Sequence, residues 1–139
     1  MSTKNSRRSK LVGAAVAAAL LVVPASALAA ESTVNWQINL AHGAEFPRAT
    51  GGAQYQSQPG QQEFQVEVEH IAALKGKSVV VCVNGQEVGT AKVSLRGIAQ
   101  LSRNTELHQT VPAVGHGSTV SVTTGANCTG KLVASGQFA

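Results

Sequence analysis

The sequence predicts an all-β fold: an antiparallel β-sandwich, Ig-like or Greek-key, of about eight short strands with one disulfide. Three observations lead to this prediction. Apolar and polar residues alternate with the period of two that half-buried strands require. Turn-forming residues interrupt the alternation about every 8–12 residues. No segment after residue 30 shows a helical period. Residues 30–139 therefore form a single domain of ordinary size.

Residues 1–29 have the pattern of a bacterial signal peptide. Four basic residues come first: Lys4, Arg7, Arg8 and Lys10. An apolar run at 11–23 follows, and a small-residue signal predicts cleavage between Ala29 and Ala30. Because the run is too short for a stable membrane anchor, we expect a secreted or extracytoplasmic protein. The paired arginines leave twin-arginine export open beside the general secretory route.

Four elements near the start of the domain are predicted from clear patterns. Residues 34–40 and 64–69 alternate between apolar and polar side chains, which predicts strands with one buried face. Residues 78–83 are rich in valine, which suits a strand buried on both faces. Asn84-Gly85 follows, and both residues accept the positive φ angles of a type I′ hairpin turn.

The remaining elements are predicted from weaker patterns. The return strand of the hairpin covers residues 88–95, with Gly89 as a bulge. Residues 71–75 suffice for one helical turn. Residues 44–62 are rich in Gly, Gln and Pro, so we expect a mobile loop with only a short strand at Ala53 and Tyr55. Further strands are expected at 97–101, 107–111, 118–124 and 132–138, with turns at 102–104, 112–117 and 125–130.

The two cysteines, Cys82 and Cys128, are predicted to form a disulfide, because an even pair in an exported chain is normally oxidised. On the loop-entropy estimate, this bridge would stabilise the fold by about 4 kcal/mol. Two distant cysteines without a neighbouring histidine do not have the spacing of a zinc site. No cofactor is expected.

The charge distribution argues against one class of partners. The chain carries 11 Lys+Arg and 7 Asp+Glu, but four of the basic residues lie in the leader. The domain is therefore formally neutral and has no basic surface for a phosphate backbone, so nucleic-acid binding is not expected. All the acidic residues are Glu. The chain thus lacks the Asp that commonly orients a catalytic His or fills a calcium loop.

The titratable side chains form no recognisable catalytic or metal-binding motif. Glu67 and Glu69 share one strand face, where a solvated polar surface is a simpler interpretation than a glycosidase pair. The histidines are not spaced as ligands on one strand or helix, although two of them flank the Val111-Pro112 turn and can face each other across a hairpin. No catalytic residue and no metal ligand is assigned. The four histidines are His42, His70, His108 and His116.

One segment is a candidate binding loop. The aromatic residues of the predicted strands fall on the apolar side, which leaves Phe46 as the aromatic expected to be exposed. Its neighbours Pro47 and Arg48 complete the candidate site. The loop over residues 43–59 is long enough to be presented to a protein, as in a secreted inhibitor.

A short motif gives a family resemblance. Residues 40–55 read Leu-Ala-His-Gly-Ala-Glu-Phe-Pro-Arg-Ala-Thr-Gly-Gly-Ala-Gln-Tyr. This segment resembles the start of chordin-like (CHRD) domains, in which a strand, a Gly-Ala-x-Glu-x-Pro-like loop and a Thr-Gly-x-Ala step lead into the next strand. The resemblance implies a Greek-key β-sandwich of about this size. It then ends, because residues 83–89 stand where that family often carries a His-x-His element. The later pattern resembles small uncharacterised bacterial exported proteins, and neither resemblance identifies a functional residue.

These observations favour an exported, non-catalytic binding or structural module of the bacterial cell envelope or medium. Its expected partner is an unknown protein or a cell-wall component, bound through loops or a strand edge. The alternatives are a metal-binding protein or enzyme that uses the histidines, and a secreted inhibitor that presents the 43–59 loop.

Overall fold

The computed structural model describes residues 32–139, and the all-β prediction is confirmed. The predicted leader and its cleavage point between Ala29 and Ala30 lie outside these residues. Two single-turn 3-10 helices accompany eight strands, and neither helix is long or apolar enough to cross a membrane. The elements are β1 (Val34–His42), β2 (Thr50–Gln58), β3 (Gln61–Glu69), η1 (Ala72–Leu74), β4 (Ser78–Val83), β5 (Gln86–Lys92), β6 (Ala99–Asn104), η2 (Thr105–Leu107), β7 (Thr119–Thr124) and β8 (Leu132–Gln137).

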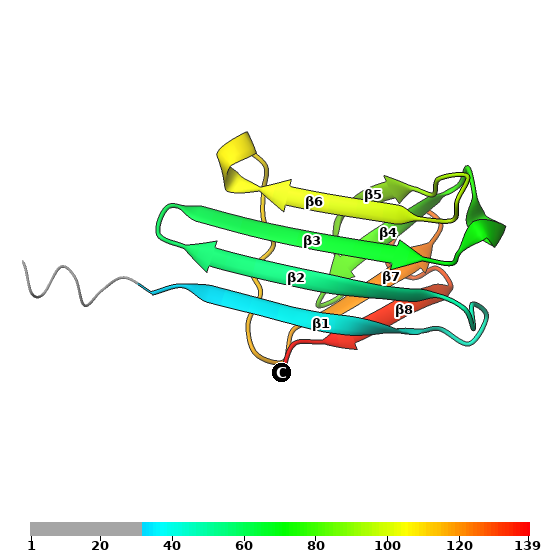
Figure 1. Ribbon diagram of the computed structural model, residues 1–139, viewed down its shortest axis with the longest axis horizontal. Helices are drawn as coiled ribbons and strands as arrows, with labels where there is room; N and C mark the ends of the chain where they lie inside the picture. The colour runs from blue at the N-terminus through cyan, green and yellow to red at the C-terminus, as the bar shows by residue number, and fades with distance from the viewer. Residues whose placement is uncertain (1–31) are drawn as a thin grey trace, which may run out of the picture. The chain divides into compact units, whose positions relative to one another are not determined.

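The strands form one antiparallel sheet in the order β5-β4-β7-β8-β1-β2-β3-β6. Figure 1 shows this sheet folded into two layers, with β1, β2, β3 and β6 in one and β4, β5, β7 and β8 in the other. The long strand β1 joins the layers, because residues 34–40 pair with β2 whereas Ala41 and His42 pair with β8. The end strands β5 and β6 lie close together, but no ladder among the described residues pairs them. The sandwich is therefore nearly closed into a barrel.

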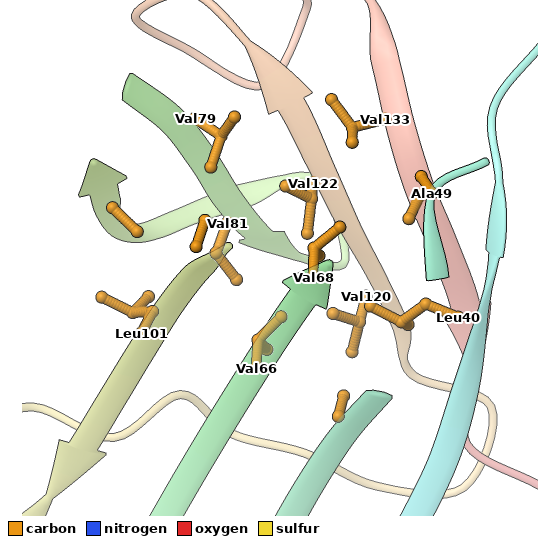
Figure 2. Close-up of a cluster of buried hydrophobic side chains, with 14 of the residues drawn as sticks. Leu40, Ala49, Val66, Val68, Val79, Val81, Leu101, Val120, Val122 and Val133 are labelled. Carbon is orange, nitrogen blue, oxygen red and sulfur yellow. The ribbon is translucent and has the colours of Figure 1, made fainter. Parts of the chain in front are cut away.

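The hydrophobic core lies between the two layers (Figure 2). The alternation predicted for residues 34–40 and 64–69 is confirmed, because both segments are strands whose apolar side chains pack into this core. The polar side chains of the same strands must then point to the outside of the layer. The labelled core residues in Figure 2 include Val66, Val68, Leu101, Val79, Val81, Val120, Val122 and Val133.

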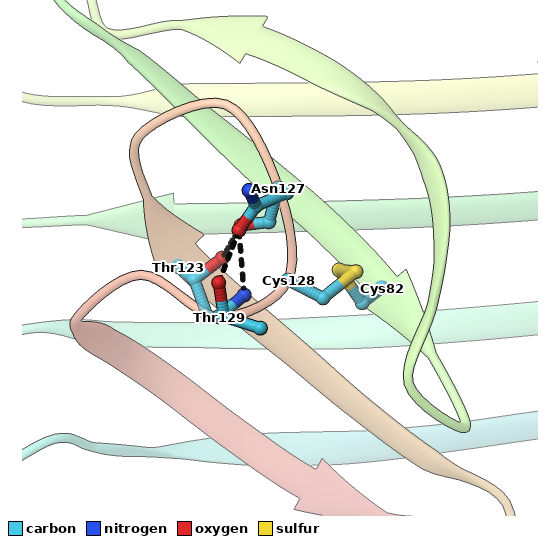
Figure 3. The surroundings of a disulfide bond; sticks show 5 residues. All are labelled: Cys82, Thr123, Asn127, Cys128 and Thr129. Atoms are coloured by element: carbon cyan, nitrogen blue, oxygen red, sulfur yellow. Dashed lines mark hydrogen bonds between the residues drawn. A yellow bond between two sulfur atoms is a disulfide. The ribbon is translucent and has the colours of Figure 1, made fainter.

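β4 is buried on both sides, as its run of valines predicts. Val79 and Val81 join the core, whereas Val80 and Cys82 lie on the outer side and are still fully buried. The outer side is covered by residues 125–130, here called the disulfide loop. The predicted disulfide is confirmed: Cys128 of this loop is bonded to Cys82 with an S–S distance of 2.04 Å (Figure 3).

The predicted hairpin after β4 is confirmed. Asn84 and Gly85 have φ angles of 52° and 79°, as the type I′ turn requires. The bulge lies beside the predicted glycine: Val81 is opposite Gly89 and Cys82 is opposite Glu87, so Val88 is the extra residue. The return strand starts at Gln86 and ends at Lys92, earlier than predicted.

The predicted mobile loop at residues 44–62 is wrong, because most of this segment is β2 and the start of β3. Ala53 and Tyr55 are buried on the inner side of β2, and the residues between them face outward. Gly and Gln occupy so many outward positions that the strand pattern is hard to see in the sequence. The connection shrinks to residues 43–49, so a 43–59 inhibitory loop does not exist.

Two boundaries later in the chain also differ from the prediction. The turn expected at residues 102–104 is part of β6, which pairs with β3 as far as Asn104. The strand expected at residues 107–111 is wrong: η2 ends at Leu107, and the chain then crosses to β7 without a strand (Figure 1). Val111 and Val114 pack singly against the core, so their spacing does not reflect a strand.

Candidate functional site

The outer side of the β1-β2-β3-β6 layer carries polar side chains in a regular grid, here called the polar face. The ladder register aligns one residue from each strand into rows across the layer. Eight of the twelve positions are Asn or Gln and two are Glu, and none is aromatic or basic. All twelve are at least partly exposed. The rows are Asn35–Gln56–Glu63–Asn104, Gln37–Gln54–Gln65–Ser102 and Asn39–Gly52–Glu67–Gln100.

A shallow groove of about 390 Å³ crosses the four strands between the second and third rows. The two rows form its walls, and the intervening residues 38, 53, 66 and 101 form its floor. Neighbouring strands are about 4.8 Å apart, so the groove extends about 14 Å from β1 to β6. The two walls are two residues apart along each strand, or about 7 Å. This shape suits an extended polymer lying across the strands.

Gly52 leaves a gap in one wall of the groove. Its neighbour Gly51 is explained by packing, because a Cβ there would overlap the backbone oxygen of Glu67. A Cβ on Gly52 would have one close neighbour, the Ile38 carbonyl oxygen at 3.2 Å, and otherwise open space. β2 pairs with both neighbours without a bulge at this point. The missing side chain at Gly52 therefore leaves a gap in the groove wall, and the one tight contact of a Cβ at this position would be with the Ile38 backbone.

Two glutamine–glutamate pairs hold side chains of the polar face in place. Gln100 Nε2 donates to Glu67 Oε2, and Gln65 Nε2 donates to Glu63 Oε1. Glu67 is the single charged residue that lines the groove. Glu67 and Glu69 both point outward, so their predicted place on one polar face is confirmed. The groove thus presents many neutral hydrogen-bonding groups and one carboxylate.

A second hollow, of about 690 Å³, lies beside the β4–β5 hairpin. Arg103 of β6 and residues 109–113 line its other side. The Arg103 guanidinium donates to the Ser102 carbonyl (3.1 Å) and lies over Gly89, where a Cβ would collide with it. Arg103 therefore fills part of the seam between β5 and β6. Its position gives it a packing role.

The candidate binding residues Phe46, Pro47 and Arg48 lie in the short connection between β1 and β2. Phe46 is half-buried and packs against the core, so the expectation of an exposed ring is wrong. Backbone bonds tighten the loop around it: Phe46 N–H donates to Gly43 (3.2 Å), and Ala49 N–H donates to Phe46 (3.0 Å). Pro47 and Arg48 are exposed, as expected. The apolar ring anchors the loop to the core.

The four histidines lie at separate places in the fold. His42 Nδ1 is bonded to the Gly43 carbonyl (3.0 Å), and His70 Nδ1 to Thr50 Oγ1 (3.0 Å). His108 caps η2, whereas the His116 ring lies against Trp36 with their ring centroids 4.8 Å apart. The predicted hairpin that would bring His108 and His116 face to face does not exist. Within residues 32–139, no three His, Cys, Asp or Glu side chains are grouped to hold a metal ion.

The groove was missed in the sequence because it depends on pairing between strands. Residues 35, 37 and 39 were recognised as the polar side of β1, and residues 65 and 67 as that of β3. The polar sides of the other two strands are not predicted: the sequence predicts a loop with a short strand at Ala53 and Tyr55 for β2, and a turn for the end of β6. The run of Gln, Glu and Asn at alternate positions was the available signal, but it does not reveal which residues lie side by side.

Comparison with known proteins gives no family assignment. No protein-family model matches the chain, and no curated protein is significantly similar to it. The resemblance of residues 40–55 to chordin-like domains therefore remains a prediction. Function is therefore inferred from the groove of the polar face.

Proposed function

We propose that this protein is an exported, non-catalytic binding module of the bacterial cell envelope or medium, and that the groove of the polar face is its binding site. Gly52 is the observation that carries the proposal. A glycine in a strand interior weakens the strand, so it usually marks a bulge, a tight bend or a close approach by a ligand or another backbone. At Gly52 there is no bulge, and the one atom within 4 Å of a Cβ built there is the Ile38 carbonyl oxygen, at 3.2 Å.

Two further features support export and binding. The leader pattern of residues 1–29 directs the chain out of the cytoplasm, and the Cys82–Cys128 disulfide suits an oxidising compartment. The groove is built on the middle of four paired strands, so its walls have fixed positions before a ligand arrives. Such rigidity lowers the entropic cost of binding.

The composition of the groove favours binding over hydrolysis. A glycosidase of the common kind places two carboxyl groups on either side of the bond that breaks, about 5–10 Å apart. Glu67 is the single carboxylate among the residues that line this groove. One carboxylate among carboxamides can hold a ligand by hydrogen bonds, but the lining of the groove lacks the second carboxylate that such a hydrolysis requires.

Co-sedimentation with washed cell envelopes tests this proposal. The processed protein, residues 30–139, is suitable because its core and all eight strands lie within residues 33–139. We expect wild-type protein to bind, and Gly52→Gln to bind at least about tenfold more weakly because the new side chain fills the groove. Gln54→Ala combined with Gln65→Ala removes the opposite wall and is expected to have the same effect.

Gly115→Gln is the matched control. Gly115 lies in the crossing to β7, and a Cβ there would meet nothing within 4 Å. This variant adds the same side chain away from the groove, so it is expected to bind as wild type does. Unchanged binding of a folded Gly52→Gln protein, or no binding by wild type, would contradict the proposal.

A further inference from the structure

We infer that the groove takes a neutral, hydroxyl-rich polysaccharide chain that lies across β1, β2, β3 and β6. The inference names the ligand of the proposed binding site and therefore rests on the proposed function. It is argued from the hydrogen-bonding groups of the groove, its charge and its position on the sheet.

The walls of the groove match hydroxyl groups. A carboxamide has two N–H donors and a carbonyl acceptor, and a hydroxyl also both donates and accepts, so the two can pair in many orientations. Gln37, Gln54 and Gln65 line one wall, and Asn39 and Gln100 line the other. A chain of sugar rings presents hydroxyls on both edges at regular intervals. It can thus bond to both walls at once.

The charge of the polar face disfavours anionic polymers. Glu67 lies in the groove and Glu63 in the adjoining row, and no Lys or Arg occupies any of the three rows. A phosphate or carboxylate on the ligand would meet these two side chains without a compensating cation. A neutral chain meets no such repulsion, and its hydroxyls can donate to the carboxylates.

The position of the groove disfavours a peptide. An extended peptide binds a sheet by adding a strand to its edge, where backbone groups are free. This groove crosses the middle of the layer, where β2 and β3 have partners on both sides. Protein interfaces also depend on buried anchors such as Trp, Tyr and Arg, and the twelve positions of the polar face include none of these.

The expected affinity is low for a short ligand. Stacking of sugar rings on aromatic side chains is unavailable at this face, so hydrogen bonds in competition with water supply most of the binding energy. We expect a dissociation constant of about 1 mM for a hexasaccharide. A long polysaccharide that engages several protein molecules would be bound more tightly through multivalency.

Nuclear magnetic resonance tests the inference directly. The ¹⁵N-labelled processed protein is titrated to about 10 mM with neutral hexasaccharides of β-1,4-glucose, α-1,4-glucose, β-1,4-mannose and β-1,4-N-acetylglucosamine, and separately with polyglutamate. We expect at least one neutral saccharide to shift the side-chain amide signals of Gln37, Gln54 and Gln65, and polyglutamate to shift none of them.

Three variants locate the binding. Gly52→Gln is expected to abolish the shifts. Gln62→Ala is expected to leave them unchanged, because Gln62 lies on β3, as Gln65 does, but outside the polar face. Glu67→Gln is expected to keep the affinity for the neutral saccharide within about threefold, since a carboxamide can replace the carboxylate as an acceptor. A larger loss would show that binding requires the negative charge of Glu67 and would count against the inference.

Together, the envelope-binding and titration results distinguish an error in the ligand class from an error in the location of the binding site. The inference is overturned if none of the neutral saccharides shifts the groove signals, or if polyglutamate does. If envelope binding is lost in Gly52→Gln and no neutral saccharide binds, the ligand is of another class, such as a protein, while the groove remains the binding site. If envelope binding is unaffected by Gly52→Gln, the proposed function itself is wrong.

Discussion

The outer sides of the two layers of the sandwich carry very different side chains. On the β4–β7 side, Val80 and Cys82 are fully buried, and Thr123 Oγ1 donates to the Asn127 carbonyl of the disulfide loop (3.0 Å). On the β1-β2-β3-β6 side, carboxamides stand in rows that no other segment of residues 32–139 buries. One side contributes to stability as a second, small core, whereas the other adds little to stability.

The difference between the two sides indicates which surface is the better candidate for a functional site. The residues of the covered side have a structural role, because apolar side chains and a disulfide stabilise the fold there. On the polar face, Gly52 weakens β2 and leaves a gap in the groove wall, and its one tight packing neighbour is the Ile38 carbonyl oxygen. Stability measurements on substituted residues of the two sides test whether the covered side contributes more to stability than the polar face.

The largest effect is expected from removing the disulfide. Cys82→Ala combined with Cys128→Ala removes the covalent link between two positions that are 46 residues apart in the sequence. The loop-entropy estimate gives a loss of about 4 kcal/mol in the free energy of unfolding. Urea denaturation of the double variant against wild type measures this. A loss below about 1 kcal/mol would show that the disulfide loop is a minor contributor and would weaken the contrast between the two sides.

The adjacent glycines of β2 are expected to respond differently to alanine. Gly51→Ala places a Cβ against the backbone oxygen of Glu67, and the strain should cost about 2 kcal/mol. Gly52→Ala has only the Ile38 carbonyl oxygen nearby, at 3.2 Å, so we expect a change within about 1 kcal/mol. Thermal unfolding of both variants gives the comparison. Equal destabilisation would mean that Gly52 is also required by packing, which removes the main support for the binding site.

The smallest contrast concerns one outward residue from each side. Val80→Ala removes two buried methyl groups under the disulfide loop and should cost about 2 kcal/mol. Gln65→Ala truncates an exposed side chain of the polar face and should change stability by less than about 0.5 kcal/mol. Both values come from chemical denaturation. A large effect at Gln65 would assign its bond to Glu63 a structural role.

The sequence was sufficient for the elements in which both sides of a strand are distinct. Residues 34–40 and 64–69 alternate between apolar and polar, and Asn84-Gly85 has the geometry that a type I′ turn demands, so these features were predicted correctly. Only a short strand at Ala53 and Tyr55 is predicted within β2, because Gly51, Gly52 and the outward glutamines have the composition of a loop. Pairing with β1 and β3 makes this segment a strand, and pairing is not visible in one segment alone.

The candidate site was harder to predict than the fold for the same reason. The sequence predicts Phe46 as a binding residue because it is an aromatic in a loop, yet its ring packs against the core. It does not predict Gln54 or Ser102 as site residues, although the register places both in one row of the groove. Residues that line the groove lie up to 65 residues apart in the sequence, as Gln37 and Ser102 do. Only the order and alignment of the strands brings them together.

The uninterrupted alignment of β1, β2 and β3 has a consequence for how this protein can change during evolution. Inserting or deleting a single residue within β3 would turn Phe64, Val66 and Val68 toward water and Gln65 and Glu67 toward the interior. Substitutions along the outward rows can therefore be frequent and can retune what is recognised. Length changes should be confined to the connections between strands.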